Sequence, residues 1–253
     1  MSTIYVDSVL NQVSSPTNTI FPVNVNGANV KVIPNNLGEN VSIGIGNGAL
    51  AASTLNTELN NTALGCKALL NCSGDDNTAV GHAALQSITG ITANNNTAIG
   101  QNAGIGMTGS QNCIFIGRAS AGSTPTAANE ITLGNSANTV LRCAVTTITS
   151  LSDERDKKDI KDLSTGLEFV ETLRPVEFTW NDRDENGKHD IADFGFIAQD
   201  LKKAQEDAEK AEVLKLVYEE NPDKLEASYG KLIPILVKAI QELSEEVKQL
   251  KNK

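Results

Sequence analysis

The sequence predicts a mainly β repeat region followed by an α+β domain that ends in a coiled-coil helix. Three observations lead to this prediction. A short Asn-Thr-Ala-aliphatic-Gly motif recurs in the first part, the density of charged residues rises sharply near residue 150, and the last residues carry aliphatic side chains at helical spacing. We expect a strand-rich segment at residues 1–39, a repeat region at 40–150 and the α+β domain at 151–253.

The first segment, residues 1–39, contains short β-prone runs interrupted by an Asn-Gly pair and by Pro16, Pro22 and Pro34. Proline and Asn-Gly mark turns, so the runs predict several short strands. We interpret this segment as a docking module, although no residue in it identifies a partner.

The repeat region contains three copies of the motif and three related ones, spaced 16 to 19 residues apart. The copies end at Gly46, Gly65, Gly81, Gly100, Gly117 and Gly134. A unit this short cannot bury a core alone, so the copies must stack. Each unit offers one short strand, a Gly where backbones approach closely, and small Ala residues. Aromatic residues are only 4% of the chain, so the core must be thin and aliphatic. This pattern favours a β-solenoid or an intertwined trimeric β-fibre.

Charge and composition exclude several classes of function. The net charge is −10, and residues 1–150 are nearly uncharged, so no basic surface is available for nucleic acid or for an anionic membrane. No apolar run approaches the ~20 residues of a membrane span, and the N-terminus does not resemble a secretion signal. The four cysteines lack zinc or disulfide spacing and are expected to be reduced core residues. We predict no cofactor and no metal site.

The junction after the repeats carries the most specific motif. Residues 152–157 read Ser-Asp-Glu-Arg-Asp-Lys, and the pattern Ser-Asp-x-Arg-x-Lys resembles the cleavage motif of endosialidase-type intramolecular chaperone domains, which end phage tail spikes. Further motifs follow in that family's order at Leu173–Trp180, Phe194–Asp200 and Tyr229–Leu232. The resemblance therefore runs from Ser152 to about Leu250. The repeats are similar to the heads of trimeric autotransporter adhesins and to repeats in viral fibres.

The resemblance implies a self-cleaving serine peptidase that acts once, on its own chain. Ser152 is then the nucleophile, Lys157 the general base, and the cut falls between Leu151 and Ser152. Asp153 and Arg155 would hold the turn and stabilise developing charge. Since free lysine has a pKa of about 10.4, burial or a nearby cation must favour the neutral amine.

Two features of the junction weigh against catalysis. Ser152 and Asp153 also suit a helix N-cap, with Lys157 simply solvated. Asp156 stands where the family usually has an apolar residue, and an acid beside a lysine favours the charged form.

The last helix carries a seam of aliphatic residues at spacings of three and four, which predicts a coiled coil. The seam consists of Ile233, Leu236, Ile240, Leu243, Val247 and Leu250. The pattern alone favours two strands, whereas the resemblance implies a homotrimer. The alternative is an amphipathic helix packed on its own domain.

The function implied by the resemblance is that of a viral tail fibre or spike protein, located in the virion and assembled in the host cytoplasm. Its C-terminal domain trimerises the chain, assists folding of the fibre and releases itself. Further partners would be a virion attachment protein and a host-surface receptor. The alternative is a trimeric fibre or adhesin that is not cut and keeps a permanent C-terminal cap. A glycan-cutting spike is disfavoured because the repeats have almost no acidic pairs.

Residues Asp182–Asp193 fit part of a calcium-loop pattern. Helices should flank such a loop, whereas Val176–Trp180 and Phe194–Ile197 are typical of strands. We therefore predict a β-hairpin turned at Asn186–Gly187.

Overall fold

The computed structural model describes most of the chain after residue 29. The described residues are 30–34, 41–52, 60–138, 140–145, 148–181, 183 and 190–253. The chain divides between Asn135 and Ser136 into two compact units, which are treated separately below. Of the expected docking segment 1–39, only Val30–Pro34 lies within the described residues.

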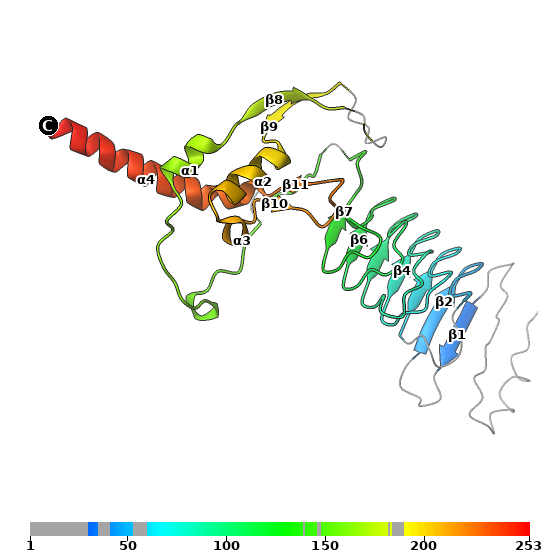
Figure 1. Cartoon of the computed structure of the whole chain (residues 1–253). Coiled ribbons are helices and arrows are strands. Elements are labelled where there is room, and N and C mark those ends of the chain that lie inside the picture. Colours follow the sequence, from blue (N-terminus) through cyan, green and yellow to red (C-terminus); the bar gives the residue numbers. More distant parts are fainter. Residues whose placement is uncertain are drawn as a thin grey trace, which may run out of the picture. The chain divides into compact units, whose positions relative to one another are not determined.

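The first unit is a β-solenoid whose strands follow one another in chain order (Figure 1). Its strands are β1 (Val30–Pro34), β2 (Val41–Ile45), β3 (Thr62–Leu64), β4 (Thr78–Val80), β5 (Thr97–Ile99), β6 (Ile114–Ile116) and β7 (Ile131–Leu133). Strands β2 to β7 pair in parallel, and β1 covers the first edge by pairing antiparallel with β2. The structure is therefore the predicted β-solenoid.

The Thr-Ala-aliphatic part of the motif supplies each strand. Ala63, Ala79 and Ala98 are in register and fully inside, and Phe115 takes the equivalent place in β6. The residues on either side of them point outward, as the alternation of side chains along a strand requires. The small alanines explain how a thin core closes with so few aromatic residues.

The motif's Asn forms an internal ladder of side-chain hydrogen bonds. Asn61, Asn77 and Asn96 are fully buried. The Asn77 amide donates to the carbonyl oxygen of Ala93 at 2.9 Å, and its oxygen accepts from the backbone N–H of Asn96 at 3.0 Å. Because buried polar groups must be paired, these side chains satisfy backbone groups that the corners between strands leave free.

The motif's Gly permits close approach between successive turns. Gly65 has a φ of +137°, and a Cβ placed on it would lie 2.4 Å from the carbonyl oxygen of Gly81. Gly81 has the same relation to Gly100. A larger residue would meet backbone atoms that cannot move aside, which explains why the motif ends in Gly.

The second unit is α+β and ends in a long helix, as predicted. Its elements are η1 (Glu154–Asp156), α1 (Leu167–Thr172), β8 (Val176–Thr179), β9 (Ala192–Gly195), α2 (Ala198–Asp207), α3 (Ala211–Leu214), β10 (Val217–Tyr218), β11 (Glu226–Ala227), η3 (Tyr229–Lys231) and α4 (Leu232–Lys251). A small core joins α1, α2 and α4 through Phe169, Leu201, Leu216 and Ile235. No helix in the described part of the chain is both long and apolar enough to cross a membrane.

The predicted hairpin is present, with one strand shifted. β8 pairs antiparallel with β9, and Val176 lies opposite Gly195. The second strand was expected at Phe194–Ile197 and instead covers Ala192–Gly195. After its last residue, the Phe196 N–H donates to the Tyr229 hydroxyl at 3.1 Å.

The expected turn at Asn186–Gly187, and most of the Asp182–Asp193 loop, lies outside the described residues. Among the residues that the structure describes, no group of three or more His, Cys, Asp or Glu side chains could hold a metal ion.

The four cysteines are free thiols, and only two of them are core residues. Cys72 and Cys113 are buried inside the solenoid, Cys66 is half-buried, and Cys143 is exposed. The expectation of four core cysteines is therefore wrong for Cys143, which lies after the last solenoid strand where no further turn covers it.

We predict that Asn77→Ala destabilises the solenoid. The substitution leaves the Asn96 N–H and the Ala93 carbonyl without their partner, at a cost of roughly 1–3 kcal/mol for each buried group. Urea unfolding followed by circular dichroism measures the change. Asn71→Ala is the control, because Asn71 is exposed and should change the free energy of unfolding by less than about 0.5 kcal/mol. Equal effects of the two substitutions would contradict the ladder's role.

Candidate functional site

The junction motif folds into a short turn built around Asp153. Asp153 caps η1, with Oδ1 accepting from the Arg155 backbone N–H at 2.9 Å. The Arg155 side chain returns to the same carboxylate, with Nε 3.0 Å from Oδ1 and a terminal nitrogen 2.6 Å from Oδ2. The turn closes where the Lys157 N–H donates to the Glu154 carbonyl at 3.0 Å. These contacts suit the turn-holding role predicted for Asp153 and Arg155.

This turn brings Ser152 and Lys157 together. The Lys157 Nζ donates to the Ser152 Oγ at 2.7 Å and to the Ser152 carbonyl oxygen at 3.0 Å. The residue that caps η1 is Asp153, so the Ser152 hydroxyl is not used as the cap. A hydroxyl next to an amine is the arrangement that a Ser-Lys pair needs for proton transfer.

The charged side chains of Asp153 and Arg155 shift each other's pKa. The Arg155 guanidinium lowers the pKa of the Asp153 carboxyl, and the Arg155 backbone N–H adds to this effect. In return, the Asp153 carboxylate raises the pKa of Arg155. Because Asp153 already holds the guanidinium, the role of Arg155 in stabilising developing charge stays a prediction.

The pair lies in water in the single chain. All residues from Leu151 to Ile160 are exposed, and Leu151, which precedes the predicted cut, is 99% exposed. The peptide bond before Ser152 is thus open to attack, but within the described part of the chain no other segment removes water from Ser152 and Lys157.

The C-terminal helix α4 has two distinct apolar faces. One face buries Leu232, Ile235 and Ala239. The Glu242 carboxylate of α4 also accepts from the Leu167 N–H at 2.7 Å, and this hydrogen bond lowers the pKa of Glu242.

The second face of α4 is the predicted seam. Its members are between 40% and 68% exposed: Ile233, Leu236, Ile240, Leu243, Val247 and Leu250. Packing on its own domain therefore uses other residues of α4 and leaves the seam uncovered.

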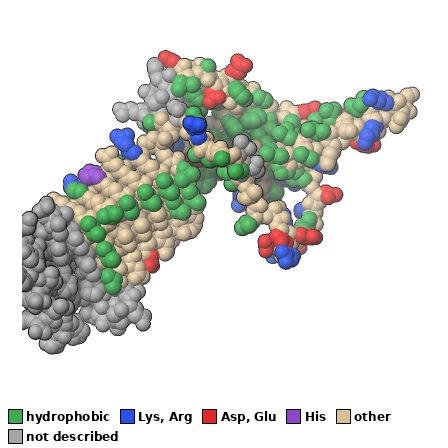
Figure 2. Space-filling model, turned by 180° about the vertical axis from the view of Figure 1, so that it is seen from behind, with side chains coloured by type: hydrophobic (Ala, Val, Ile, Leu, Met, Phe, Trp, Pro, Cys, Tyr) green, Lys and Arg blue, Asp and Glu red, His purple; other side chains and the backbone are tan. Residues whose placement is uncertain are grey.

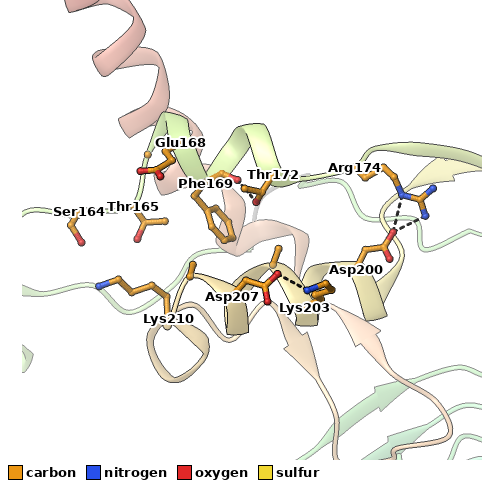
Figure 3. Close-up of a pocket in the computed structure, with 13 residues that line it drawn as sticks. Ser164, Thr165, Glu168, Phe169, Thr172, Arg174, Asp200, Lys203, Asp207 and Lys210 are labelled. Carbon is orange, nitrogen blue, oxygen red and sulfur yellow. Dashed lines mark hydrogen bonds and ion pairs between the residues drawn. The ribbon is translucent and has the colours of Figure 1, made fainter.

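A cavity of about 660 Å³ lies between α1 and α2 (Figure 3). Phe169 lines it, and two ion pairs cross or border it: Arg174 with Asp200 and Lys203 with Asp207, both at 2.7 Å. Neither Ser152 nor Lys157 lines this cavity.

The sequence analysis did not single out the ion pair between Arg174 and Asp200. Its signal was present, because Arg174 belongs to the motif Leu173–Trp180 and Asp200 to the motif Phe194–Asp200. The contact attaches the chain before β8 to the first turn of α2, where a carboxylate also suits the helix dipole. We interpret it as a structural link between the two motifs.

Residues 152–210 match the model of a peptidase family described as the chaperone of endosialidase. The matched segment begins at Ser152 and includes the junction turn, α1, the hairpin and α2. The family recognised from the junction motif is thereby confirmed for this segment, and the repeat region lies outside the match. No curated protein and no solved structure matches the chain.

We predict that the pKa of the Asp153 carboxyl in the folded protein lies below its ordinary value of 3.8. A depressed pKa means that the cap stabilises the turn above the ordinary pKa and that this contribution is lost as the pH falls through the lowered value. Carbon-detected NMR titration of Asp153 measures it. Arg155→Gln should return the pKa towards 3.8, and Lys158→Gln is the matched control and should leave it unchanged. Unaltered titration of Asp153 in Arg155→Gln would contradict the ion pair.

Proposed function

We propose that the second unit is a self-cleaving chaperone: it joins three chains, assists folding of the solenoid and then cuts the backbone between Leu151 and Ser152. The observation that carries the proposal is the 2.7 Å distance between Ser152 Oγ and Lys157 Nζ. The match of residues 152–210 to the chaperone of endosialidase supports the same role.

Assembly supplies what the single chain lacks. A lysine acts as a base only when it is neutral, and burial favours its neutral form. Ser152 and Lys157 are exposed in one chain, so a second chain must cover them before proton transfer becomes efficient. The uncovered seam of α4 is the surface through which the chains meet. Cleavage then follows assembly and does not precede it.

The chemistry proceeds through an ester. Neutral Lys157 accepts the proton of the Ser152 hydroxyl, and Oγ adds to the carbonyl carbon of Leu151. The Leu151–Ser152 C–N bond breaks, and Lys157 passes the proton to the Ser152 nitrogen, which leaves Leu151 esterified to the Ser152 oxygen. Water then adds to the ester, which releases the Leu151 carboxylate and restores the Ser152 hydroxyl. Each chain turns over once.

Release of the chaperone would trap the assembled solenoids. Stacked parallel strands need non-local contacts and form slowly, so a domain that aligns chains accelerates their assembly. Once that domain has left, the product cannot return along the same route, and its persistence depends on the unfolding rate. This role suits a viral tail fibre or spike in the virion, made in the host cytoplasm and bound to an attachment protein and a receptor.

A second candidate function keeps the trimeric fibre or adhesin but omits the cut, with the second unit as a permanent cap. The exposure of Ser152 and Lys157 to water in the single chain favours this candidate. Intact mass separates the two functions, because only the cutting protein yields residues 1–151 and 152–253.

We predict that Ser152→Ala and Lys157→Ala each leave the chain full length, because one removes the nucleophile and the other removes the base. A denaturing gel and intact mass of the purified protein measure processing. Lys158→Ala is the matched control, since this exposed neighbour has no place in the pair, and it should be cut like the parent. Normal processing in either test variant would refute the pair.

We predict that Ile240→Asp prevents both assembly and cutting. Ile240 is 66% exposed on the seam, so the substitution spares the core of the single domain while placing a charge in the contact between chains. Light scattering after size exclusion gives the number of chains, and the gel gives processing. Gln241→Asp adds the same charge at an exposed position beside the seam and should leave both unchanged. A monomer that still cuts itself would disprove the requirement for assembly.

A further inference from the structure

The outward side of the solenoid carries an uninterrupted column of aliphatic side chains, one on each strand from β2 to β7. The column, here called the aliphatic ladder, consists of Ile45, Leu64, Val80, Ile99, Ile116 and Leu133. Successive members are direct register partners. A second column beside it is mixed in composition, because Thr62, Thr78 and Thr97 lie between Ile43 and Ile114. Figure 2 shows hydrophobic side chains in a band across the solenoid.

The side chains of the aliphatic ladder are about half exposed, and they do not form the interior of the solenoid. Leu64 is 47% exposed, Ile99 44% and Leu133 56%, whereas the alanines between the columns are buried. With strands ~4.8 Å apart, six rungs form a stripe roughly 24 Å long. A soluble protein rarely leaves so regular an apolar surface open without a partner.

The strand-to-strand repeat of the aliphatic ladder favours a second copy of this chain as its partner. Side chains on a surface with a strand-to-strand repeat can interdigitate along its whole length only with a surface of the same repeat. The aliphatic ladder of a second copy has this repeat at every rung, whereas a globular partner would match it at one or two rungs.

The charge of this surface also favours a second copy. Two identical surfaces repel each other where they carry charge, and the chain as a whole has a net charge of −10. Strands β2 to β7 contain no charged residue. Copies can therefore approach through this face without placing like charges opposite each other.

The available area agrees with this partner. An aliphatic side chain offers on the order of 100 Å² of apolar surface, so the eight exposed aliphatics on β2 to β7 present about 400 Å². The half-exposed seam of α4 presents about 300 Å² more. Neither surface alone reaches the ~800 Å² that each partner buries in a stable complex, but the two together approach it.

We propose that the aliphatic ladder is a homotypic interface, through which the solenoids of assembled chains pack on one another along their length. The inference rests on the proposed function for the number of chains and for the area that the seam of α4 adds to the contact.

Disulfide trapping in the full chain tests this contact. In a background where exposed Cys143 and half-buried Cys66 are replaced by Ser, Ile99→Cys places a thiol on the ladder. Ile105→Cys is the matched control, because Ile105 is also an isoleucine, is 50% exposed and lies in the turn after β5, away from the strands. After mild oxidation, a non-reducing gel should show a covalent dimer for Ile99→Cys at a yield that does not fall on dilution. Ile105→Cys should give only the background of the parent.

The same gel reports cleavage, so the two proposals fail separately. Equal cross-linking at the two positions, or none at Ile99, would overturn the interface whether or not the chain is cut. A cross-link at Ile99 in an uncut chain would support the interface while the cleavage proposal fails. Circular dichroism of Ile99→Cys must match the parent, and Val80→Cys on the neighbouring rung is a second ladder variant should Ile99→Cys fold poorly.

Discussion

The solenoid depends on one constraint, which is that successive turns of chain lie a single strand spacing apart and in register. At that distance the corner of each turn has no room for a side chain, so Gly65 and Gly81 face each other through bare backbone. The corners also cannot complete a regular ladder of backbone bonds, and buried Asn77 completes it with its side chain. Each residue of the repeated motif therefore satisfies a requirement for packing or hydrogen bonding against the adjacent turn. The six copies are similar because each turn packs on an equivalent neighbour.

The second unit depends on contacts of a different kind. Its junction turn is held by residues two to five positions apart, with Asp153, Arg155, Ser152 and Lys157 all exposed. Local contacts of this kind form without a core and place a hydroxyl next to an amine. They do not exclude water. Chemistry at the junction therefore needs a change in surroundings, and the arrival of another chain is the simplest source. Under the proposed function, one chain provides the geometry of the pair and assembly provides its reactivity.

Both units leave apolar surface uncovered, for related reasons. In the solenoid, strand alternation turns the aliphatic residues of the strands outward, while the alanines between them lie inside. In α4, Leu232 and Ile235 satisfy the small domain core, and Ile240 and Leu243 on another face remain open. A chain whose two units are each incomplete in this way is suited to work as an assembly. Strands β2 to β7 contain no charged residue, which is consistent with contacts between like molecules.

The sequence by itself determined the repeat, the stacking of its copies, the change of structure near residue 150 and the family of the junction segment. These are properties of spacing and local chemistry, which a single chain displays in order. Tertiary structure decided the rest. Only folding showed that the repeats stack as a solenoid with its strands in chain order, that the Phe196 N–H after β9 donates to Tyr229, and that Arg174 reaches Asp200. Contacts between residues 26 or more positions apart leave no periodic trace in the sequence, because they depend on where whole elements lie in space.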